Sequence, residues 1–100
     1  MSKSGLTEYQ DELLVILVEE CSEAIKEVCK IDRFGINSIG SRAMERNHLT
    51  CLTQELGDIM CMIEMLRDSG MGITDEDLNN AKVRKLIKVQ KHMTHKKDVK

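Results

Sequence analysis

The chain has 100 residues and a mass of 11.4 kDa, which leaves room for one domain with one small hydrophobic core. It contains no proline, no tryptophan, one tyrosine and one phenylalanine. All-β sandwiches and barrels depend on aromatic strand residues and on turn residues, so this composition argues against them and favours a helical protein. A helical domain of this size has a thin core, which favours self-association.

The net charge of −2 conceals two oppositely charged parts of the chain. Residues 1–80 carry a net charge of −9, whereas residues 81–100 carry a net charge of +7. The basic segment is interpreted either as a solvated helix end or as a strip that binds anions. Nucleic acid is not an expected partner, because no aromatic residue lies among these basic residues and the acidic part would repel phosphate.

Neither secretion nor membrane insertion is expected. No stretch approaches the roughly 18 consecutive apolar residues of a membrane span, and the N-terminus leads into a charged segment. The four cysteines, at positions 21, 29, 51 and 61, form no Cys-x-x-Cys pair. We interpret them as small buried residues in a reducing compartment, so we expect a cytoplasmic protein.

The first of three predicted helices begins at a capping box. Thr7 is followed three residues later by Gln10, and the helical pattern continues to about Ile31. A polar loop with Gly35 and Gly40 then leads towards the second helix.

The second predicted helix begins near Asn47 or earlier and ends at Ser69-Gly70. Thr74 caps the third, which continues to about Met93. We therefore predict one all-α domain over residues 1–100, ordered from about 6 to 93, with a frayed C-terminal tail. Two long helices plus a third C-terminal helix form a helical bundle, and dimerisation completes its four-helix core.

Each long helix carries an apolar stripe at steps of four and three, which predicts the face that packs in the core. In the first helix this stripe consists of Leu14, Val18, Cys21, Ile25 and Val28. In the second helix it consists of Leu52, Leu56, Ile59, Ile63 and Leu66.

A second stripe on each long helix places a pair of acids among apolar residues. Glu20 and Glu23 on the first helix, and Glu55 and Asp58 on the second, are spaced i, i+3 and repel each other as neighbours. Antiparallel packing would bring all four carboxylates around one point, where Mg²⁺ would offset both repulsion and desolvation. The alternative is that these acids are solvated on amphipathic helices.

These acids stand in a recognisable pattern. Glu19-Glu20-Cys21-Ser22-Glu23 followed by Glu55-Leu56-Gly57-Asp58 resembles the Glu-Glu-x-x-Glu … Glu-x-x-Asp motif of the MazG-like, all-α nucleoside triphosphate pyrophosphohydrolases. Arg33-Phe34-Gly35, Asn47 and the segment with Ala81, Lys82 and Lys85 resemble the short, single-domain phage and bacterial members. The resemblance covers roughly residues 8–92. The chain departs from the family pattern in a long insert between the half-motifs and in its shortage of aromatic residues.

The resemblance implies Mg²⁺-dependent hydrolysis of a nucleoside triphosphate, in particular a deoxy or modified one, to the monophosphate and pyrophosphate. Mn²⁺ is an expected substitute for Mg²⁺. The implied metal ligands are Glu20, Glu23, Glu55 and Asp58. Glu19, Glu23 or Glu27 orients the attacking water, and the sequence leaves these three open.

Acids alone would repel a triphosphate, so the basic third helix is the natural counterweight. Lys82 and Lys85 are candidate phosphate ligands, with Arg84 and Lys88 as further possibilities. Asn47 and Asn80 are candidate ribose or phosphate contacts. Arg33 either binds phosphate or closes the first helix. His48 is interpreted as an ordinary surface residue, with a position near the site as the alternative.

Several alternatives stay open at this point. Within the same enzyme class, a dUTP- or dCTP-specific hydrolase and a phosphoribosyl-ATP pyrophosphohydrolase share the metal chemistry. Tyr9 and Phe34 are the only aromatic residues available to stack on a base, so selectivity is either broad or based on hydrogen bonds. From a different class, a non-catalytic helical interaction module would use solvated acids and a basic partner-binding tail. The expected partners are the nucleotide and a second copy of the chain, as a homodimer or a dimer of dimers.

Overall fold

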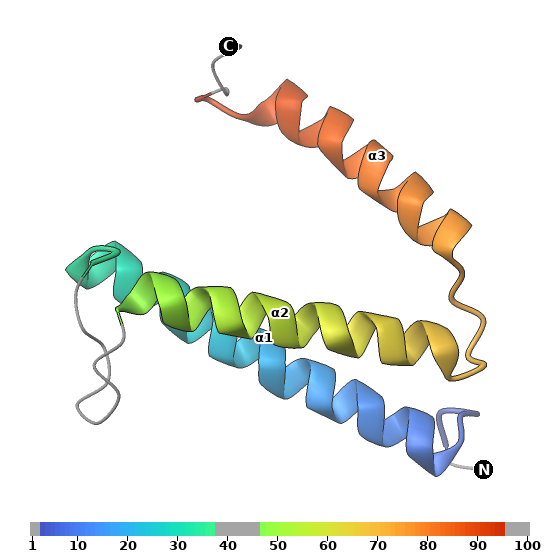
Figure 1. Cartoon of the computed structure of the whole chain (residues 1–100). Helices are drawn as coiled ribbons and strands as arrows, with labels where there is room; N and C mark the ends of the chain where they lie inside the picture. Colours follow the sequence, from blue (N-terminus) through green and yellow to red (C-terminus); the bar gives the residue numbers. More distant parts are fainter. Residues whose placement is uncertain (1–2, 38–46, 96–100) are drawn as a thin grey trace.

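The computed structural model describes residues 3–37 and 47–95, and this part of the chain folds into three α-helices without a strand (Figure 1). Helix α1 spans Glu8–Phe34, α2 spans His48–Asp68 and α3 spans Asp75–His92. The predicted all-α fold class is therefore confirmed. Most of the predicted loop (38–46) and the end of the predicted tail (96–100) lie outside the described residues.

The predicted caps begin all three helices. Thr7 and Gln10 exchange hydrogen bonds of 3.0 and 3.1 Å, which complete the capping box of α1. The side chains of Asn47 and Thr74 accept hydrogen bonds from backbone N–H groups in the first turns of α2 and α3. These local signals were sufficient because each satisfies N–H groups that have no partner within the helix.

Helices α1 and α2 pack side by side as an antiparallel hairpin (Figure 1). Leu13 of α1 and Met62 and Leu66 of α2 form the centre of the core, each at most 6% exposed. Met71 and Ile73, in the connection to α3, pack against this cluster. The core of the single chain is thus a narrow strip near the open end of the hairpin.

The stripes predicted to form the core are largely exposed in the single chain. Val18, Ile25 and Val28 of α1 are 68%, 63% and 53% exposed, and in the stripe of α2 only Leu66 is buried. The reason is that α1 turns the face that carries Leu13 and Glu20 towards α2, so that the predicted stripe beside it points outwards.

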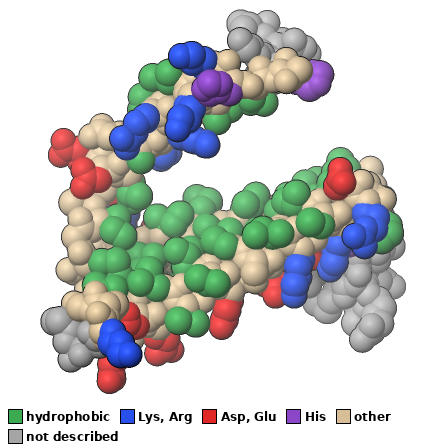
Figure 2. All heavy atoms as spheres, turned by 180° about the vertical axis from the view of Figure 1, so that it is seen from behind, with side chains coloured by type: hydrophobic (Ala, Val, Ile, Leu, Met, Phe, Trp, Pro, Cys, Tyr) green, Lys and Arg blue, Asp and Glu red, His purple; other side chains and the backbone are tan. Residues whose placement is uncertain are grey.

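The exposed stripes join into one surface on the hairpin, which we call the apolar face. Figure 2 shows it on the side of the hairpin that is turned towards α3. It consists of Leu14, Val18, Cys21, Ile25 and Val28 from α1, and of Leu52, Leu56, Ile59 and Ile63 from α2.

A polar contact closes the hairpin at each end. At one end, Gln10 Nε2 donates a 2.8 Å hydrogen bond to the Ser69 carbonyl oxygen. At the other, His48 Nδ1 lies 3.3 Å from Glu27 Oε2, and the Phe34 ring stacks on the imidazole at 6.2 Å between centroids. Together these contacts fix the register of α2 along α1.

Two predictions about single residues are wrong. His48 is only 3% exposed, because the acceptor Glu27 and the Phe34 ring give its imidazole partners inside the hairpin. Cys29 and Cys61 are exposed, because they point away from the strip where α1 meets α2; all four cysteines are free thiols.

Helix α3 stands away from the hairpin, and none of its residues is buried (Figure 1). Its start is attached to the end of α2 by Arg67, which bonds Asp75 at 3.1 Å and Asp68 at 3.0 Å. Hydrogen bonds to these carboxylates, Asp68 first, raise the pKa of the Arg67 guanidinium. None of the helices within the described residues is long and apolar enough to traverse a lipid bilayer.

Replacing His48 by alanine should lower the free energy of unfolding by about 1–3 kcal/mol, because the partly buried Glu27 carboxylate would lose a hydrogen-bond partner. His92→Ala, on the exposed surface of α3, is the matched control and should change stability little. Urea unfolding followed by circular dichroism measures both. Equal stability of the two variants would show that the Glu27–His48 contact does not stabilise the hairpin.

Candidate metal centre

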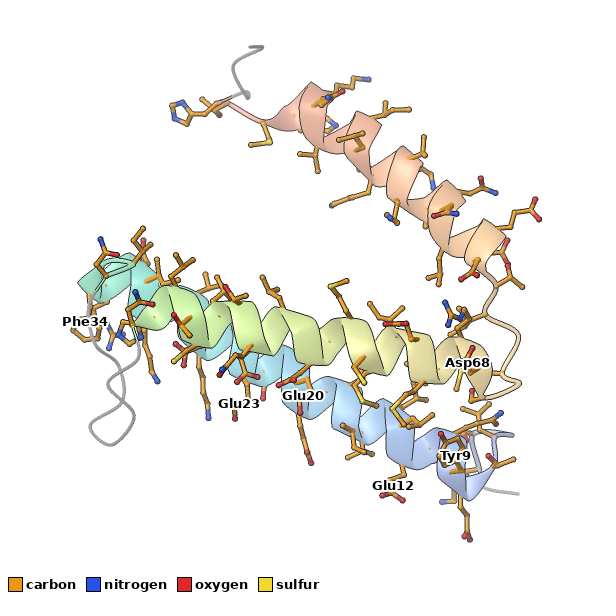
Figure 3. All side chains as sticks on the ribbon, viewed as in Figure 1. Tyr9, Glu12, Glu20, Glu23, Phe34 and Asp68 are labelled. Atoms are coloured by element: carbon orange, nitrogen blue, oxygen red, sulfur yellow. The ribbon has the colours of Figure 1, made fainter. Side chains whose placement is uncertain are left out.

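Three of the four predicted metal ligands come together between the helices of the hairpin. Glu20 of α1 meets Glu55 and Asp58 of α2, and one carboxylate oxygen from each lies within 4.8 Å of the others. Glu20 and Glu55 are partly buried, whereas Asp58 is exposed at the rim. Figure 3 places Glu20 along the edge of the hairpin that lies away from α3.

The register of the hairpin explains why these residues meet. Glu27 faces His48, and moving seven residues along each antiparallel helix leads to Glu20 and Glu55. Seven residues are about two helical turns, so this step restores the same face on both helices. The Glu27–His48 contact therefore sets the register that brings Glu20 opposite Glu55.

The cluster is electrostatically unfavourable without a cation. Burial is the largest cause that raises the pKa of the Glu20 carboxyl, followed by the negative charges of Asp58 and Glu55. These are the two costs that a bound divalent cation would offset, since it supplies positive charge and replaces the lost water ligands.

The donor set fits a hard divalent cation. Three carboxylates supply only oxygen ligands, which suit Mg²⁺ and Mn²⁺, and Mg²⁺ commonly keeps water or takes phosphate oxygens in its remaining positions. Glu20, Glu55 and Asp58 would hold the ion, and the exposed side at Asp58 leaves an approach for a phosphorylated ligand.

The remaining acids of the motif lie around this cluster. Glu23 is exposed, one turn from Glu20, and pairs with Lys26 at 3.5 Å. Glu19 is exposed as well. Glu27 is held by His48 and by Lys30 at 3.4 Å, and its side chain is only 12% exposed.

The structure does not gather the predicted substrate-binding residues around the cluster. Lys82, Lys85 and Asn80 are carried by α3 and are exposed. Asn47 caps α2, and Arg33 lies over the Phe34 ring at 5.7 Å in the last turn of α1. Arg33 is about 20 Å from Glu20 along the helix axis.

One structural element of the site was missed from the sequence: the Glu27–His48 contact. Its spacing could have revealed it. Glu27 lies seven residues after Glu20 and His48 lies seven residues before Glu55, so each shares a helix face with an acid of the cluster. A histidine at the first position of a helix, opposite a glutamate in line with the acidic stripe, indicates such a contact once the antiparallel arrangement is assumed.

Comparisons with known proteins add no relative: no family model, no curated protein and no solved structure matches the chain. The function of the chain is therefore inferred from its residues and their geometry.

Glu20→Gln should stabilise the cation-free protein at neutral pH, because it removes one charge from the cluster. A carboxyl with a raised folded-state pKa stabilises the fold below its ordinary pKa and loses that contribution as pH rises through the folded-state pKa. The advantage of the variant should therefore vanish in acid and grow towards neutral pH. Thermal unfolding in EDTA across this pH range measures it.

Glu12→Gln is the matched control, since Glu12 is an exposed acid on α1 (Figure 3). It should show no such pH-dependent gain. If Glu20→Gln and Glu12→Gln behave alike at every pH, the cluster carries no repulsion that a cation would relieve.

Proposed function

We propose that the chain is a Mg²⁺-dependent nucleoside triphosphate pyrophosphohydrolase that releases pyrophosphate and a nucleoside monophosphate. The observation that carries this proposal is the convergence of Glu20, Glu55 and Asp58 from two antiparallel helices onto one point. Carboxylates from facing helices are a recurrent way to build a metal site in a helical bundle. The resemblance of the two acidic half-motifs to the MazG-like enzymes supports the same chemistry.

The reaction is the addition of water across the anhydride bond between the α- and β-phosphates. The new P–O bond forms from water, the bridging P–O bond breaks, and the water proton passes to a carboxylate or to solvent. A bound divalent cation supplies charge neutralisation on the phosphate oxygens.

The residues of the chain position this reaction. The cation that binds the phosphate oxygens would be held by Glu20, Glu55 and Asp58. Glu23 orients the attacking water. Glu23 is preferred over Glu27 because Glu27 is engaged with His48, whereas Glu23 is exposed one turn from Glu20. Glu19 is a second exposed candidate for this role.

The substrate class is a deoxynucleoside triphosphate or a modified one, with base selectivity that does not depend on aromatic stacking within the chain. Tyr9 and Phe34 lie near opposite ends of α1, about 17 and 21 Å from Glu20 along the helix axis. Phe34 is moreover engaged with His48 and Arg33. The base is therefore either recognised by hydrogen bonds or not strongly discriminated.

The active form is proposed to be a homodimer, alone or paired into a tetramer. The chain exposes 8263 Å², whereas a compact protein of its mass is expected to expose about 5,800 Å². Its radius of gyration is 17.0 Å, against about 13 Å for a compact chain of this length. This excess surface is available for burial between two copies.

Hydrolysis is tested with a panel of canonical and modified dNTPs, including dUTP and dCTP, together with phosphoribosyl-ATP, with and without Mg²⁺. Metal-dependent pyrophosphate release from one or more of them is expected. Glu55→Gln should lower turnover by at least about 100-fold with an unchanged circular dichroism spectrum, because it removes a ligand of the cation.

Glu12→Gln makes the same chemical change at an exposed acid outside the cluster and should keep wild-type turnover. Normal turnover in Glu55→Gln would overturn the metal assignment. Absence of metal-dependent release from every compound would favour the non-catalytic interaction module.

Self-association is tested by Ile25→Asp, which places a charge on the apolar face. Ile25 is 63% exposed in the single chain, so the fold of the chain tolerates the change. In a dimer packed through this face the new carboxylate would be buried, and the cost of burying it would dissociate the two copies. Light scattering at micromolar concentration should show a dimer or tetramer for the wild type and the 11.4 kDa of one chain for the variant.

Val15→Asp is the control, because Val15 is 57% exposed but does not belong to the apolar face. It should leave the assembly intact. A wild-type protein that is monomeric at micromolar concentration contradicts the shared core.

A further inference from the structure

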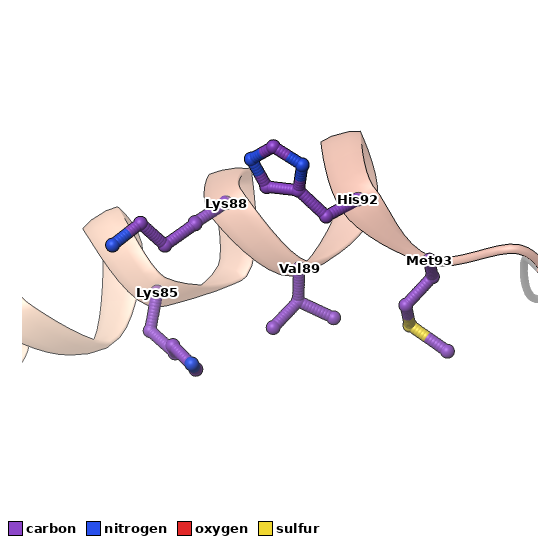
Figure 4. Close-up of a pocket in the computed structure, with 5 residues that line it drawn as sticks. All are labelled: Lys85, Lys88, Val89, His92 and Met93. Carbon is purple, nitrogen blue, oxygen red and sulfur yellow. The ribbon is translucent and has the colours of Figure 1, made fainter.

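Helix α3 presents a stripe that combines apolar and basic residues and has little to pack on in its own chain. Leu78, Leu86, Val89 and Met93 recur at helical spacing, and Lys82 lies within the same stripe. Val89 and Met93 project from one side of the helix, with Lys85 beside them (Figure 4). The other basic residues that border this side are Lys88 and His92.

The lysines of α3 do not face the acid cluster of their own chain. Lys82 lines a groove of about 570 Å³ between α2 and α3, whose α2 wall includes Met60, Ile63 and Glu64. Met60 follows Asp58 by two residues, which turns it by about 200° around the helix. The groove and the cluster therefore open on different sides of α2.

The two views of the molecule agree with this separation. In Figure 3, Glu20 and Glu23 lie along the edge of the hairpin that is remote from α3. In Figure 2, hydrophobic side chains cover the surface turned towards α3, and open space separates that surface from the helix. The apolar face thus lies between α3 and the acid cluster of the same chain.

A second copy of the chain fits this arrangement. Two hairpins packed through their apolar faces form a four-helix core, and the partner hairpin then occupies the space beneath α3. The acid cluster of each hairpin lies on the side away from its own apolar face. Stacking therefore turns the partner's cluster outwards, towards the stripe of α3 that runs from Leu78 through Lys82 to Met93, which we call the inner stripe.

We propose that α3 of each copy crosses the hairpin of the other and completes its site in trans. Lys82 and Lys85 of one chain would bind the phosphates held at Glu20, Glu55 and Asp58 of the partner subunit. The inference rests on the proposed function for the identity of the ligand, whereas the exchange of α3 rests on the geometry alone.

Charge supports this assignment. The chain carries a net charge of −9 over residues 1–80 and +7 over residues 81–100. Within the described residues, the apolar face lies between the acid cluster of the hairpin and the lysines of α3 (Figure 2). Exchange of α3 brings the opposite charges of two copies together. A triphosphate bound to a cation between them would contact positive charge from both sides.

The trans arrangement is tested by mixing two inactive variants. Glu55→Gln removes the cation site but keeps α3, whereas Lys82→Glu with Lys85→Glu removes the phosphate ligands but keeps the acids. Random mixed dimers should recover about a quarter of wild-type turnover, because half of the dimers are mixed and each has one intact site. If each site used its own α3, no mixed dimer would contain an intact site and no activity would return.

Lys91→Glu is the control, because it reverses a positive charge on the side of α3 away from the inner stripe, at a residue to which no role in binding is assigned. This variant should keep wild-type turnover alone. Loss of activity comparable to that of the Lys82/Lys85 variant would show that α3 acts through net charge rather than through the two named lysines.

A second readout does not require any hydrolysis. A photo-crosslinking amino acid in place of Leu86 is introduced into an equal mixture of ¹⁴N- and ¹⁵N-labelled chains. Crosslinked peptide pairs of mixed isotope, joining α3 to α1 or α2, are expected from the exchange of α3. Pairs of uniform isotope only, or a monomeric protein, would overturn the exchange, whereas failure of the nucleotide panel alone would overturn the proposed function.

Discussion

The antiparallel contact between α1 and α2 is the constraint on which the rest of the structure depends. It is narrow: Leu13, Met62 and Leu66 supply its buried centre, and Gln10 and His48 close its two ends. If α2 shifted by one turn along α1, Glu20 would no longer lie opposite Glu55. The register that pairs Glu20 with Glu55 is the one that pairs Glu27 with His48. Because so few apolar residues are buried in this contact, it fixes the register of the two helices but contributes little to the free energy of unfolding.

The rotation of α1 about its axis divides the hairpin into two working surfaces. Because Leu13 and its neighbours turn towards α2, the acids lie on one side of the seam and the apolar face lies on the other. Arg67 joins the start of α3 to the end of α2 through Asp75, and α3 leaves on the apolar side (Figure 2). The placement of the acids and of the apolar face thus follows from one rotational choice.

The sequence predicted the elements whose causes are local. Thr7, Asn47 and Thr74 cap their helices as expected, because a cap needs only a side-chain oxygen and the next few N–H groups. The meeting of Glu20 with Glu55 and Asp58 was also predictable, since it follows from two spacings and an antiparallel packing.

The rest depended on tertiary packing. Each long helix carries an apolar stripe and, beside it, a stripe that mixes acids with apolar residues, and the sequence pattern does not reveal which one faces the neighbouring helix within a single chain. The burial of His48 depended on Glu27 and Phe34, which are distant in sequence. The contact between Arg67 and Asp75, which joins α2 to the start of α3, has no signal in the local sequence pattern.

The raised pKa of Glu20 has a consequence for how such a chain can change over generations of mutation. Substitutions that neutralise an acid of the cluster relieve repulsion and so stabilise the cation-free fold, while they weaken its hold on a cation. Selection for stability alone would therefore erode the cluster. The stability of the empty fold does not by itself favour keeping three acids whose carboxylate oxygens lie within 4.8 Å of one another.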